Sequence, residues 1–484
     1  MPELSTIGII FYELVVIATI VHVLMDNRQP DRTMAWALVI FFVPFVGIIL
    51  YLFFGVNTRK DKHISRRSMN QLTKSSMLEF VEQRNLKVDD KHKQLVDLFV
   101  NQNLSLPFKD NYTEIFIDGD SMFKAFLDDI KNAKHHIHID MYIWEADELG
   151  KCIADALIEK ARQGVEVRVI YDDVGCWRVP NAFFDNMSSN GIQVEPFMPV
   201  RFPTLTRRVN YRNHRKVIVV DGRVGYIGGM NIADRYVKGT ATQEWRDTML
   251  RIEGGVVYGL QRTFLVDWYF VTGKLITDHV YYPQLNVAAP NDCVAQVVTS
   301  SPVAEFPDIM QGYVRIIMGA KHYVYIQTPY FMPTEPVLFA LKTAALGGID
   351  VRIMVPERGD AYFVEWASRS YLREVVEAGV KVYLYRAGFM HSKMMVCDDS
   401  IVTCGSTNVD FRSFENNFEA NIFFYDEPTA LRHKRIFLDD QRHKRIFLDD
   451  QRHSLLLSKI KKRMRPPFII HFWESLVRVF SPLM

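Results

Sequence analysis

The longest apolar runs of this chain lie at its N-terminal end. Residues 7–25 are apolar except for Glu13 and His22, and residues 34–54 carry no charged side chain. About 20 apolar residues suffice for a helix to cross a bilayer. The short polar connection between the two runs, DNRQPDRT, makes them antiparallel. The pattern therefore predicts a two-helix transmembrane hairpin over residues 1–57.

Other readings of this region fit less well. A cleavable signal peptide is disfavoured because no basic region precedes the first run and a second run follows it. Two buried core helices are the remaining alternative. Pro44 should kink the second helix.

The segment TRKDKHISRR after that helix is basic, so the positive-inside rule places the N-terminus and everything after residue 57 in the cytoplasm.

Beyond residue 108, strand-like runs alternate with helical periodicity, and several of them occur twice. AKHHIHIDMYI at 133–143 matches AKHYVYIQTPYF at 320–331, and GVEVRVI at 164–170 matches GIDVRIM at 348–354. A strand, a helical pattern and a glycine stop in succession are typical of βαβ units. The sequence thus predicts two similar α/β lobes. We expect a basic linker or juxtamembrane helix over 58–108, lobe 1 over 109–285 and lobe 2 over 286–484.

The C-terminal part of lobe 2 contains a perfect tandem copy. RHKRIFLDDQ at 432–441 is repeated at 442–451, within a segment, 430–453, that is predicted to be helical. Ten extra residues rotate a continuous helix by about −80°, so the second copy cannot reuse the contacts of the first.

The basic, amphipathic tail after residue 458 either docks on the membrane or packs on lobe 2, and packing is favoured.

The chemistry is concentrated in two stretches, NHRKVIVVDGRVGYIGGMN at 213–231 and MHSKMMVCDDSIVTCGSTN at 390–408. In both, a His is followed at fixed spacing by Lys, Asp, Gly and Asn. One such match would be a chance event, whereas two in one chain imply two half-sites. The repeated positions are His214, Lys216, Asp221, Gly228 and Asn231, and His391, Lys393, Asp398, Gly405 and Asn408.

The pattern has a direct structural interpretation. Each His-x-Lys step opens a buried apolar strand, and residues two apart on a strand share a face, so each His lies beside its Lys. Asp221 and Gly222 form a strong hairpin-turn signal. Asn231 opens a short helical pattern, and helix N-termini attract anions. Imidazoles, ammonium groups and amides meeting in one place predict a phosphate site.

The paired motifs resemble those of the phospholipase D superfamily. The resemblance implies two lobes with mixed sheets flanked by helices, related by a pseudo-twofold axis, that exchange phosphodiesters without metal or cofactor. It also implies that one His attacks phosphorus while the other moves protons. We assign His214 as nucleophile and His391 as acid/base, although the reverse order fits the sequence almost equally. The remaining predicted catalytic residues are Lys216, Lys393, Asp221 and Asp398, and the predicted phosphate contacts are Asn231, Asn408, Gly229 and Ser406.

Some of these residues have structural alternatives. Asp221 and Asp398 stand at hairpin turns, so they can brace the motifs instead of taking part in catalysis. The family places a carboxylate behind each His to orient it, and Asp247 and Glu419 follow the two motifs in similar apolar settings. Glu244 competes with Asp247 for this role. An ordinary surface-strand carboxylate is the alternative for all three.

With the membrane hairpin, the resemblance narrows to bacterial cardiolipin synthases. It implies transfer of a phosphatidyl group from one phosphatidylglycerol to another, in the bacterial plasma membrane, with cytoplasmic lobes. Phosphatidylglycerol, cardiolipin and the bilayer are the expected partners. A hydrolase or another phosphatidyltransferase is the alternative. A membrane-anchored nuclease or a non-catalytic scaffold is disfavoured by a net charge of only +2 and by the intact motifs. The scattered cysteines suit a reducing compartment.

Overall fold

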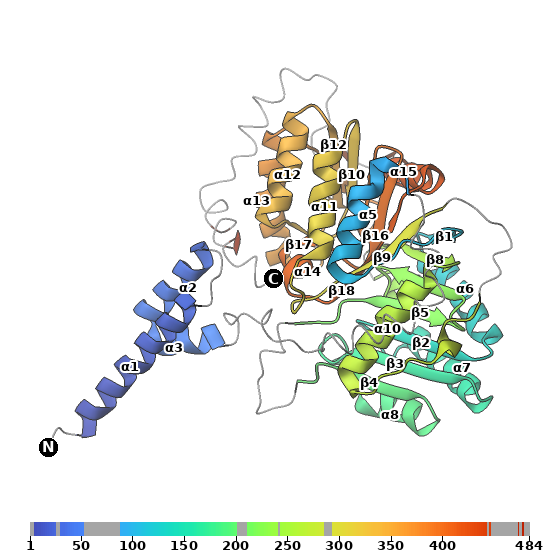
Figure 1. Ribbon diagram of the computed structural model, residues 1–484, viewed down its shortest axis with the longest axis horizontal. Helices are drawn as coiled ribbons and strands as arrows, with labels where there is room; N and C mark the ends of the chain where they lie inside the picture. The colour runs from blue at the N-terminus through green and yellow to red at the C-terminus, as the bar shows by residue number, and fades with distance from the viewer. Residues whose placement is uncertain are drawn as a thin grey trace.

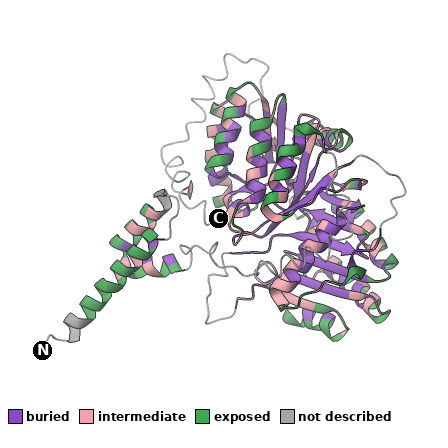
Figure 2. Cartoon of the chain, in the orientation of Figure 1, coloured by how far each residue is buried: buried purple, intermediate pink, exposed green. Residues whose placement is uncertain are grey.

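The computed structural model shows two packed α/β lobes and a separate group of N-terminal helices (Figure 1). The sheets lie buried between helices, whereas the N-terminal helices expose most of their length (Figure 2). The structure describes residues 4–25, 30–52, 88–200, 211–240, 243–284 and 293–442, with positions 445–446, 473 and 477–478.

The N-terminal helices are α1 (Leu4–Met25), α2 (Pro30–Phe42) and α3 (Pro44–Leu50). Among the described helices, the 18-residue stretch Gly8–Met25 of α1 is long and apolar enough to cross a membrane, with a mean hydropathy of 2.2. Only 6% of this stretch is buried. The first predicted span therefore corresponds to one helix with an apolar, exposed surface.

The predicted second span is not one helix. It breaks at Val43, whose φ of −133° is not helical, because Pro44 has no amide hydrogen to donate and its ring crowds the preceding turn. The chain then bends back sharply. A Cβ on Gly47 would meet the Val39 carbonyl oxygen at 2.8 Å. The expected kink at Pro44 is thus a full break, and the prediction of a continuous helix over 34–54 is wrong.

Lobe 1 is built on a seven-stranded mixed sheet in the order β1-β8-β6-β5-β2-β3-β4, with β2, β3 and β4 parallel. Its helices α6, α7 and α8 pack on one face, and α10 packs on the face toward lobe 2 (Figure 1). The strands are β1 (Tyr112–Phe116), β2 (His136–Met141), β3 (Glu166–Asp172), β4 (Gln193–Phe197), β5 (Lys216–Val220), β6 (Val224–Gly228), β7 (Trp245–Arg246) and β8 (Met249–Glu253). The helices are α6 (Gly119–Asn132), α7 (Glu148–Arg162), α8 (Asn181–Ser189), α9 (Arg235–Lys238), α10 (Val257–Thr272) and the 3₁₀ turn η5 (His279–Tyr281).

Lobe 2 repeats this order. Its eight-stranded sheet runs β19-β13-β12-β10-β15-β16-β18-β9, and the seven strands from β13 to β9 correspond in sequence order and direction to β4 to β1. The predicted duplication of α/β lobes is confirmed. The strands are β9 (Ala295–Ser300), β10 (Tyr323–Gln327), β11 (Phe331–Met332), β12 (Asp350–Pro356), β13 (Lys381–Tyr385), β14 (Phe389–Met390), β15 (Met394–Cys397), β16 (Ile401–Gly405), β17 (Val409–Asp410), β18 (Glu419–Phe424) and β19 (Arg445–Ile446). The helices are α11 (Asp308–Gly319), α12 (Glu335–Leu346), α13 (Tyr362–Glu377), α14 (Phe411–Glu415) and α15 (Glu427–Arg442).

One helix from the predicted linker belongs to lobe 2. Helix α5 (Asp90–Asn103) starts at an Asp89 cap and packs beside α11 and β9. The Phe99 ring lies 4.6 Å from that of Phe423, and Asn103 donates a hydrogen bond to the Asp308 carboxylate. Residues 58–87 of the predicted linker lie outside the described part. The outer helical layer of lobe 2 thus contains α5, which precedes lobe 1 in the sequence, and α11, which follows it.

The second copy of the tandem repeat does not continue the helix that contains the first copy. Helix α15 holds the first copy and ends at Arg442, so the prediction of a helix to residue 453 is wrong. Arg445–Ile446 of the second copy instead pairs antiparallel with β13. The first copy already fills the helical position: Phe437 is fully buried against the Tyr325 ring. A second copy continued as helix would turn the same apolar residues toward a different side.

The described residues of the C-terminal tail pack on lobe 2. Val477 is buried with Met332 and Ala367, and the Arg478 guanidinium donates to Glu374 at 2.7 Å. This agrees with the favoured expectation for the tail. The basic run at 459–465 lies outside the described residues.

Candidate active site

Both motifs begin where a central strand of each sheet begins. Strand β5 of lobe 1 starts at Lys216 and pairs antiparallel with β6, and β15 and β16 form the same hairpin in lobe 2. Every residue of β5 and β15 is buried. These apolar strands anchor His214 and His391, which precede them by two and three residues.

The aspartates of the motifs lie at the opposite ends of these hairpins. Asp221 adopts a φ of 53°, and its carboxylate accepts hydrogen bonds from the backbone amides of residues 134, 135 and 136 at 2.7–3.0 Å. Asp398, with a φ of 49°, accepts the equivalent bonds from residues 321–323. Seven extended residues, roughly 23 Å, separate each carboxylate from its His. Both carboxylates brace the turn against the neighbouring strand, and their catalytic role stays a prediction.

The two lobes meet through reciprocal backbone contacts at the histidines. The His214 amide donates to the Phe418 carbonyl of lobe 2 at 2.9 Å. The His391 amide donates to the Arg246 carbonyl of lobe 1 at 2.7 Å, next to a short parallel pairing of β14 with β7. At the boundary between the lobes, the backbone of each His is thus bound to the opposite lobe, at the residue just before Glu419 or Asp247.

The carboxylate behind each imidazole comes from the opposite lobe. Nδ1 of His214 lies 3.0 Å from Glu419, and Nδ1 of His391 lies 2.6 Å from Asp247. The carboxylate accepts a hydrogen bond from the Nδ1–H group, and this tautomer leaves the Nε2 lone pair for chemistry. Both carboxylates are at most 1% exposed. Glu244 is exposed, and its backbone carbonyl, not its side chain, binds the second motif through the Phe389 amide. Among the described residues, the carboxylate hydrogen-bonded to His391 is Asp247, and an orienting role for Glu244 stays a prediction.

The two lysines complete the reciprocal arrangement. Lys216 Nζ donates to the His214 carbonyl at 2.5 Å, and Lys393 Nζ donates to the His391 carbonyl. Burial lowers the pKa of Lys216 to about 7 and that of Lys393 to about 8, despite the raising effect of the two carboxylates. Both side chains therefore lose their proton at a lower pH than an ordinary lysine, and a bound anion favours the charged ammonium form.

The electrostatics of the imidazoles fit an anionic substrate. Burial, with a smaller contribution from the two lysines, lowers the pKa of His214 to about 4 and that of His391 to about 3. Burial alone would raise the pKa of Asp247, but Lys393 and His391 hold it below its ordinary value. The resting site therefore pairs two neutral imidazoles with two carboxylates. A phosphodiester between them raises the imidazole pKa values, since a nearby negative charge favours the protonated ring.

Two of the predicted phosphate contacts serve the carboxylates instead. A Cβ on Gly229 would meet Asp247 Oδ1 at 2.1 Å, so the glycine lets this carboxylate approach. The corresponding Ser406 donates its hydroxyl hydrogen to Glu419. Both positions make contacts to the orienting groups, and the phosphate contacts of these residues stay predictions.

The motif asparagines lie at equivalent positions but differ in their contacts. Asn231 accepts a hydrogen bond from the Ile143 amide at 3.1 Å and donates to the Tyr236 hydroxyl at 2.5 Å. Asn408 is buried, and within the described residues its Oδ1 finds no donor. Asn231 thus fixes the end of β2 beside the site.

Sequence reasoning missed Tyr142 beside the first motif. Tyr142 places its ring 4.8 Å from that of His214 and 4.9 Å from Lys216 Nζ. It stands just after β2, as Tyr330 stands after β10, so the repeated segments contained a signal for both. Tyr330 lies 6.4 Å from His391.

A buried polar network behind the first motif was also missed. Asn213 donates its side-chain amide to Asp140 at 2.7 Å and its backbone amide to Asp172 at 2.9 Å. Arg215 pairs with Asp267 and donates to the Glu419 carbonyl. These contacts fix the backbone on both sides of His214.

Comparison with known proteins gives the same picture. The family described as "Cardiolipin synthase, PLD-like domain" matches residues 126–268 and 313–441, and a phospholipase D-nuclease N-terminal family matches residues 14–55. The major cardiolipin synthase ClsA of Bacillus subtilis is 37% identical over 98% of this chain and 98% of its own length. Cardiolipin synthase 1 of Staphylococcus aureus is 39% identical over 97% of this chain and 95% of its own.

This chain belongs to the cardiolipin synthase family of phospholipase D-like proteins. The crystal structure of phosphatidylserine synthase from Haemophilus influenzae shares the fold, with a TM-score of 0.59 at 17% identity, covering 82% of this chain and 100% of that one. The family resemblance expected from the paired motifs is therefore confirmed, and the protein is a phosphatidyltransferase.

Proposed function

We propose that this enzyme makes cardiolipin and glycerol from two molecules of phosphatidylglycerol through a phosphatidyl–histidine intermediate. The observation that carries the proposal is the reciprocal pair of imidazoles. Each has Nδ1 held by a carboxylate of the opposite lobe, and in the described part of the chain no hydrogen bond engages Nε2 of either. Two such groups can supply a nucleophile and a proton shuttle to one phosphorus atom.

In the first step, Nε2 of His214 forms a bond to phosphorus and the bond to the glycerol oxygen breaks. His391, protonated when the substrate anion is bound, gives its proton to that oxygen, and glycerol leaves. In the second step, a glycerol hydroxyl of another phosphatidylglycerol gives its proton to His391. Its oxygen bonds to phosphorus as the P–N bond breaks. Lys216 and Lys393 stabilise the charge on the phosphoryl oxygens throughout.

The N-terminal region supports action at a bilayer. Helix α1 has the length and apolar surface of a membrane anchor, and the phospholipase D-nuclease N-terminal family matches residues 14–55. We place the enzyme in the bacterial plasma membrane as a multi-pass protein with both lobes in the cytoplasm, because the basic run follows the second apolar segment. An enzyme held there meets its lipid substrates by lateral diffusion.

The test uses full-length enzyme in detergent–phosphatidylglycerol micelles with a chelator present. Cardiolipin and free glycerol are measured together. The proposal predicts that both form in equal amounts and that both disappear in His214→Ala. Phosphatidic acid as the main product would overturn the proposal, because it would mean that water takes the phosphatidyl group.

A further inference from the structure

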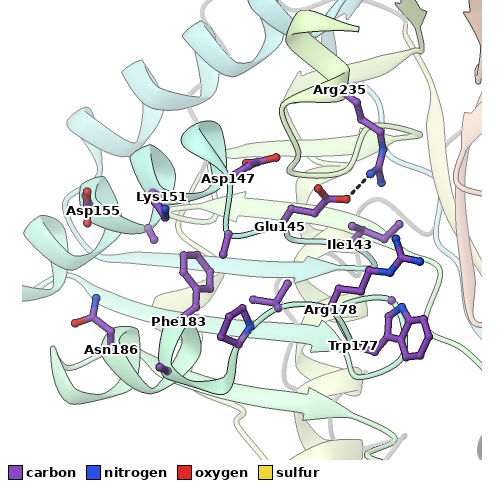
Figure 3. Close-up of a pocket in the computed structure, with 16 residues that line it drawn as sticks. Ile143, Glu145, Asp147, Lys151, Asp155, Trp177, Arg178, Phe183, Asn186 and Arg235 are labelled. Atoms are coloured by element: carbon purple, nitrogen blue, oxygen red, sulfur yellow. Dashed lines mark hydrogen bonds and ion pairs between the residues drawn. The ribbon is translucent and has the colours of Figure 1, made fainter. Parts of the chain in front are cut away.

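A cavity of about 980 Å³ opens in lobe 1, between the loops that follow β2 and β3 and the helices α7 and α8 (Figure 3). Cations, oxygen acceptors and aromatic rings all line it. Such a mixture suits a ligand with both charged and hydroxyl groups. The lining residues that matter here are Lys151, Asp155, Trp177, Arg178, Asn186 and Arg235.

The inner wall of this cavity backs onto the active site. Ile143 lines the cavity and directly follows the tyrosine whose ring contacts His214. On the other side, Arg235 packs over the Trp245 ring, which lies 5.6 Å from His391. The rings of Tyr142 and Trp245 therefore separate the cavity from the two imidazoles, and Ile143 and Arg235 line the side of the cavity that faces them.

The equivalent place in lobe 2 is already occupied by the chain itself. There the segment after β10 and the helix α13 stand where the segment after β2 and the helix α8 stand in lobe 1. Between them lies Val477, buried against Met332 and Ala367. Arg478 beside it pairs with Glu374. Among the described residues, the chain thus fills this groove in lobe 2 and leaves it open in lobe 1.

The open groove carries cationic groups that its own structure does not neutralise. In the part of the chain that the structure describes, no carboxylate lies within ion-pair distance of Lys151 or Arg178, whereas Arg235 pairs with Glu145. Trp177, 73% exposed, stands against the Arg178 guanidinium at the mouth. An exposed indole next to a cation favours the boundary between water and anionic lipid.

We propose that this cavity binds the headgroup of the acceptor phosphatidylglycerol. This inference rests on the proposed function. Lys151 and Arg178 bind the acceptor's phosphate near the mouth, and Trp177 lies at the lipid surface. The terminal glycerol points toward Ile143 and Arg235, on the side of the cavity that faces the active site, so that its hydroxyl reaches the phosphatidyl group on His214. Occupancy by the glycerol headgroup also keeps water away from the intermediate.

The test separates acceptor binding from the donor step. Full-length enzyme in phosphatidylglycerol micelles is assayed for cardiolipin formation and for exchange of labelled free glycerol into phosphatidylglycerol. Exchange uses the same donor lipid but a soluble acceptor. In the double variant Lys151→Gln/Arg178→Gln, we expect cardiolipin formation to fall about tenfold or more, because charged hydrogen bonds to phosphate are lost. Glycerol exchange should stay within about twofold of wild type.

A matched control and a conservative variant sharpen the result. Lys124→Gln/Arg223→Gln removes two exposed cations outside the cavity and should leave both reactions unchanged. Arg178→Lys, which keeps the charge, should retain most cardiolipin formation. Equal losses in both reactions would overturn the proposal by assigning the cavity to the donor lipid or to folding, and unchanged cardiolipin formation would overturn it directly. A wild-type enzyme that makes no cardiolipin would instead overturn the proposed function.

Discussion

At the scale of single residues, the acidic groups near the two motifs divide into two pairs. Asp221 and Asp398 accept hydrogen bonds from backbone amides at the far ends of the hairpins. Asp247 and Glu419 lie behind the imidazoles, buried and charged. The motif spacing alone does not show which of these four carboxylates act on a His and which brace a turn. Their separation follows from strand geometry, because seven residues of strand carry an aspartate far from its own His.

The orienting pair should control the rate of chemistry. Replacing Asp247 by Asn lets an amide donate to Nδ1, which favours the wrong tautomer of His391. We expect kcat to fall about 10²- to 10⁴-fold while the melting temperature changes little. Glu419→Gln should behave in the same way through His214. The exposed Glu244→Gln is the control and should retain wild-type kcat, and equal losses in Glu244→Gln and Asp247→Asn would contradict the assignment.

The bracing pair should control stability. Asp221→Asn weakens charge-assisted hydrogen bonds to three backbone amides, each of which contributes about 1.5–3 kcal/mol. We expect a clear fall in the free energy of unfolding, seen as a lower melting temperature. The kcat of the folded enzyme should stay within about twofold of wild type. Loss of kcat without loss of stability, in thermal melts and assays of the same sample, would restore a catalytic role for Asp221.

The buried lysines should produce an alkaline limb in the pH profile. Burial lowers the pKa of Lys216 to about 7 and that of Lys393 to about 8, so the ammonium charge is present below these values and is lost as the pH rises through them. We expect kcat/KM to fall as the pH rises from 7 to 9. At saturating lipid, kcat should hold to higher pH, because the bound phosphate raises both lysine pKa values. A kcat/KM that stays flat to pH 9 would contradict this account.

At the scale of elements, hydrophobic patterning predicted the strands and hairpins of the motifs well. It failed where a single residue or a distant partner decides the structure. Pro44 converts a uniform apolar run into α2 and α3. Helix α5 shows only a short apolar stripe, and its partner, α11, lies about 200 residues away in sequence. No local pattern connects the two.

The tandem copy offers a test at this scale. Because the copies are identical, removing either one leaves the same sequence, in which Phe437 and Asp440 keep their places on α15. We expect the protein lacking 442–451 to retain kcat within about twofold. The control is Asp440→Ala in the full chain, which breaks a buried ion pair with Arg246 and should cost about 3–5 kcal/mol of stability. A marked loss of turnover in the shortened protein would show that the second copy is needed.

At the scale of the whole molecule, one active site is assembled from two lobes that each provide half. The repeated motifs predicted this division and the chemistry. They did not predict which carboxylate serves which His. That choice depends on the pairing of β14 with β7 and of Asn213 with Phe418 across the boundary, and no sequence spacing records this register.

The central claim is that a phosphatidyl group on His214 passes to a second lipid. The most direct measurement is a pulse of phosphatidylglycerol labelled at phosphorus, followed by an acid quench and identification of the modified peptide. Part of the sample is chased with unlabelled phosphatidylglycerol. We predict label on His214 after the pulse and in cardiolipin after the chase. Label on His391, on neither His, or chased only into phosphatidic acid would contradict the account.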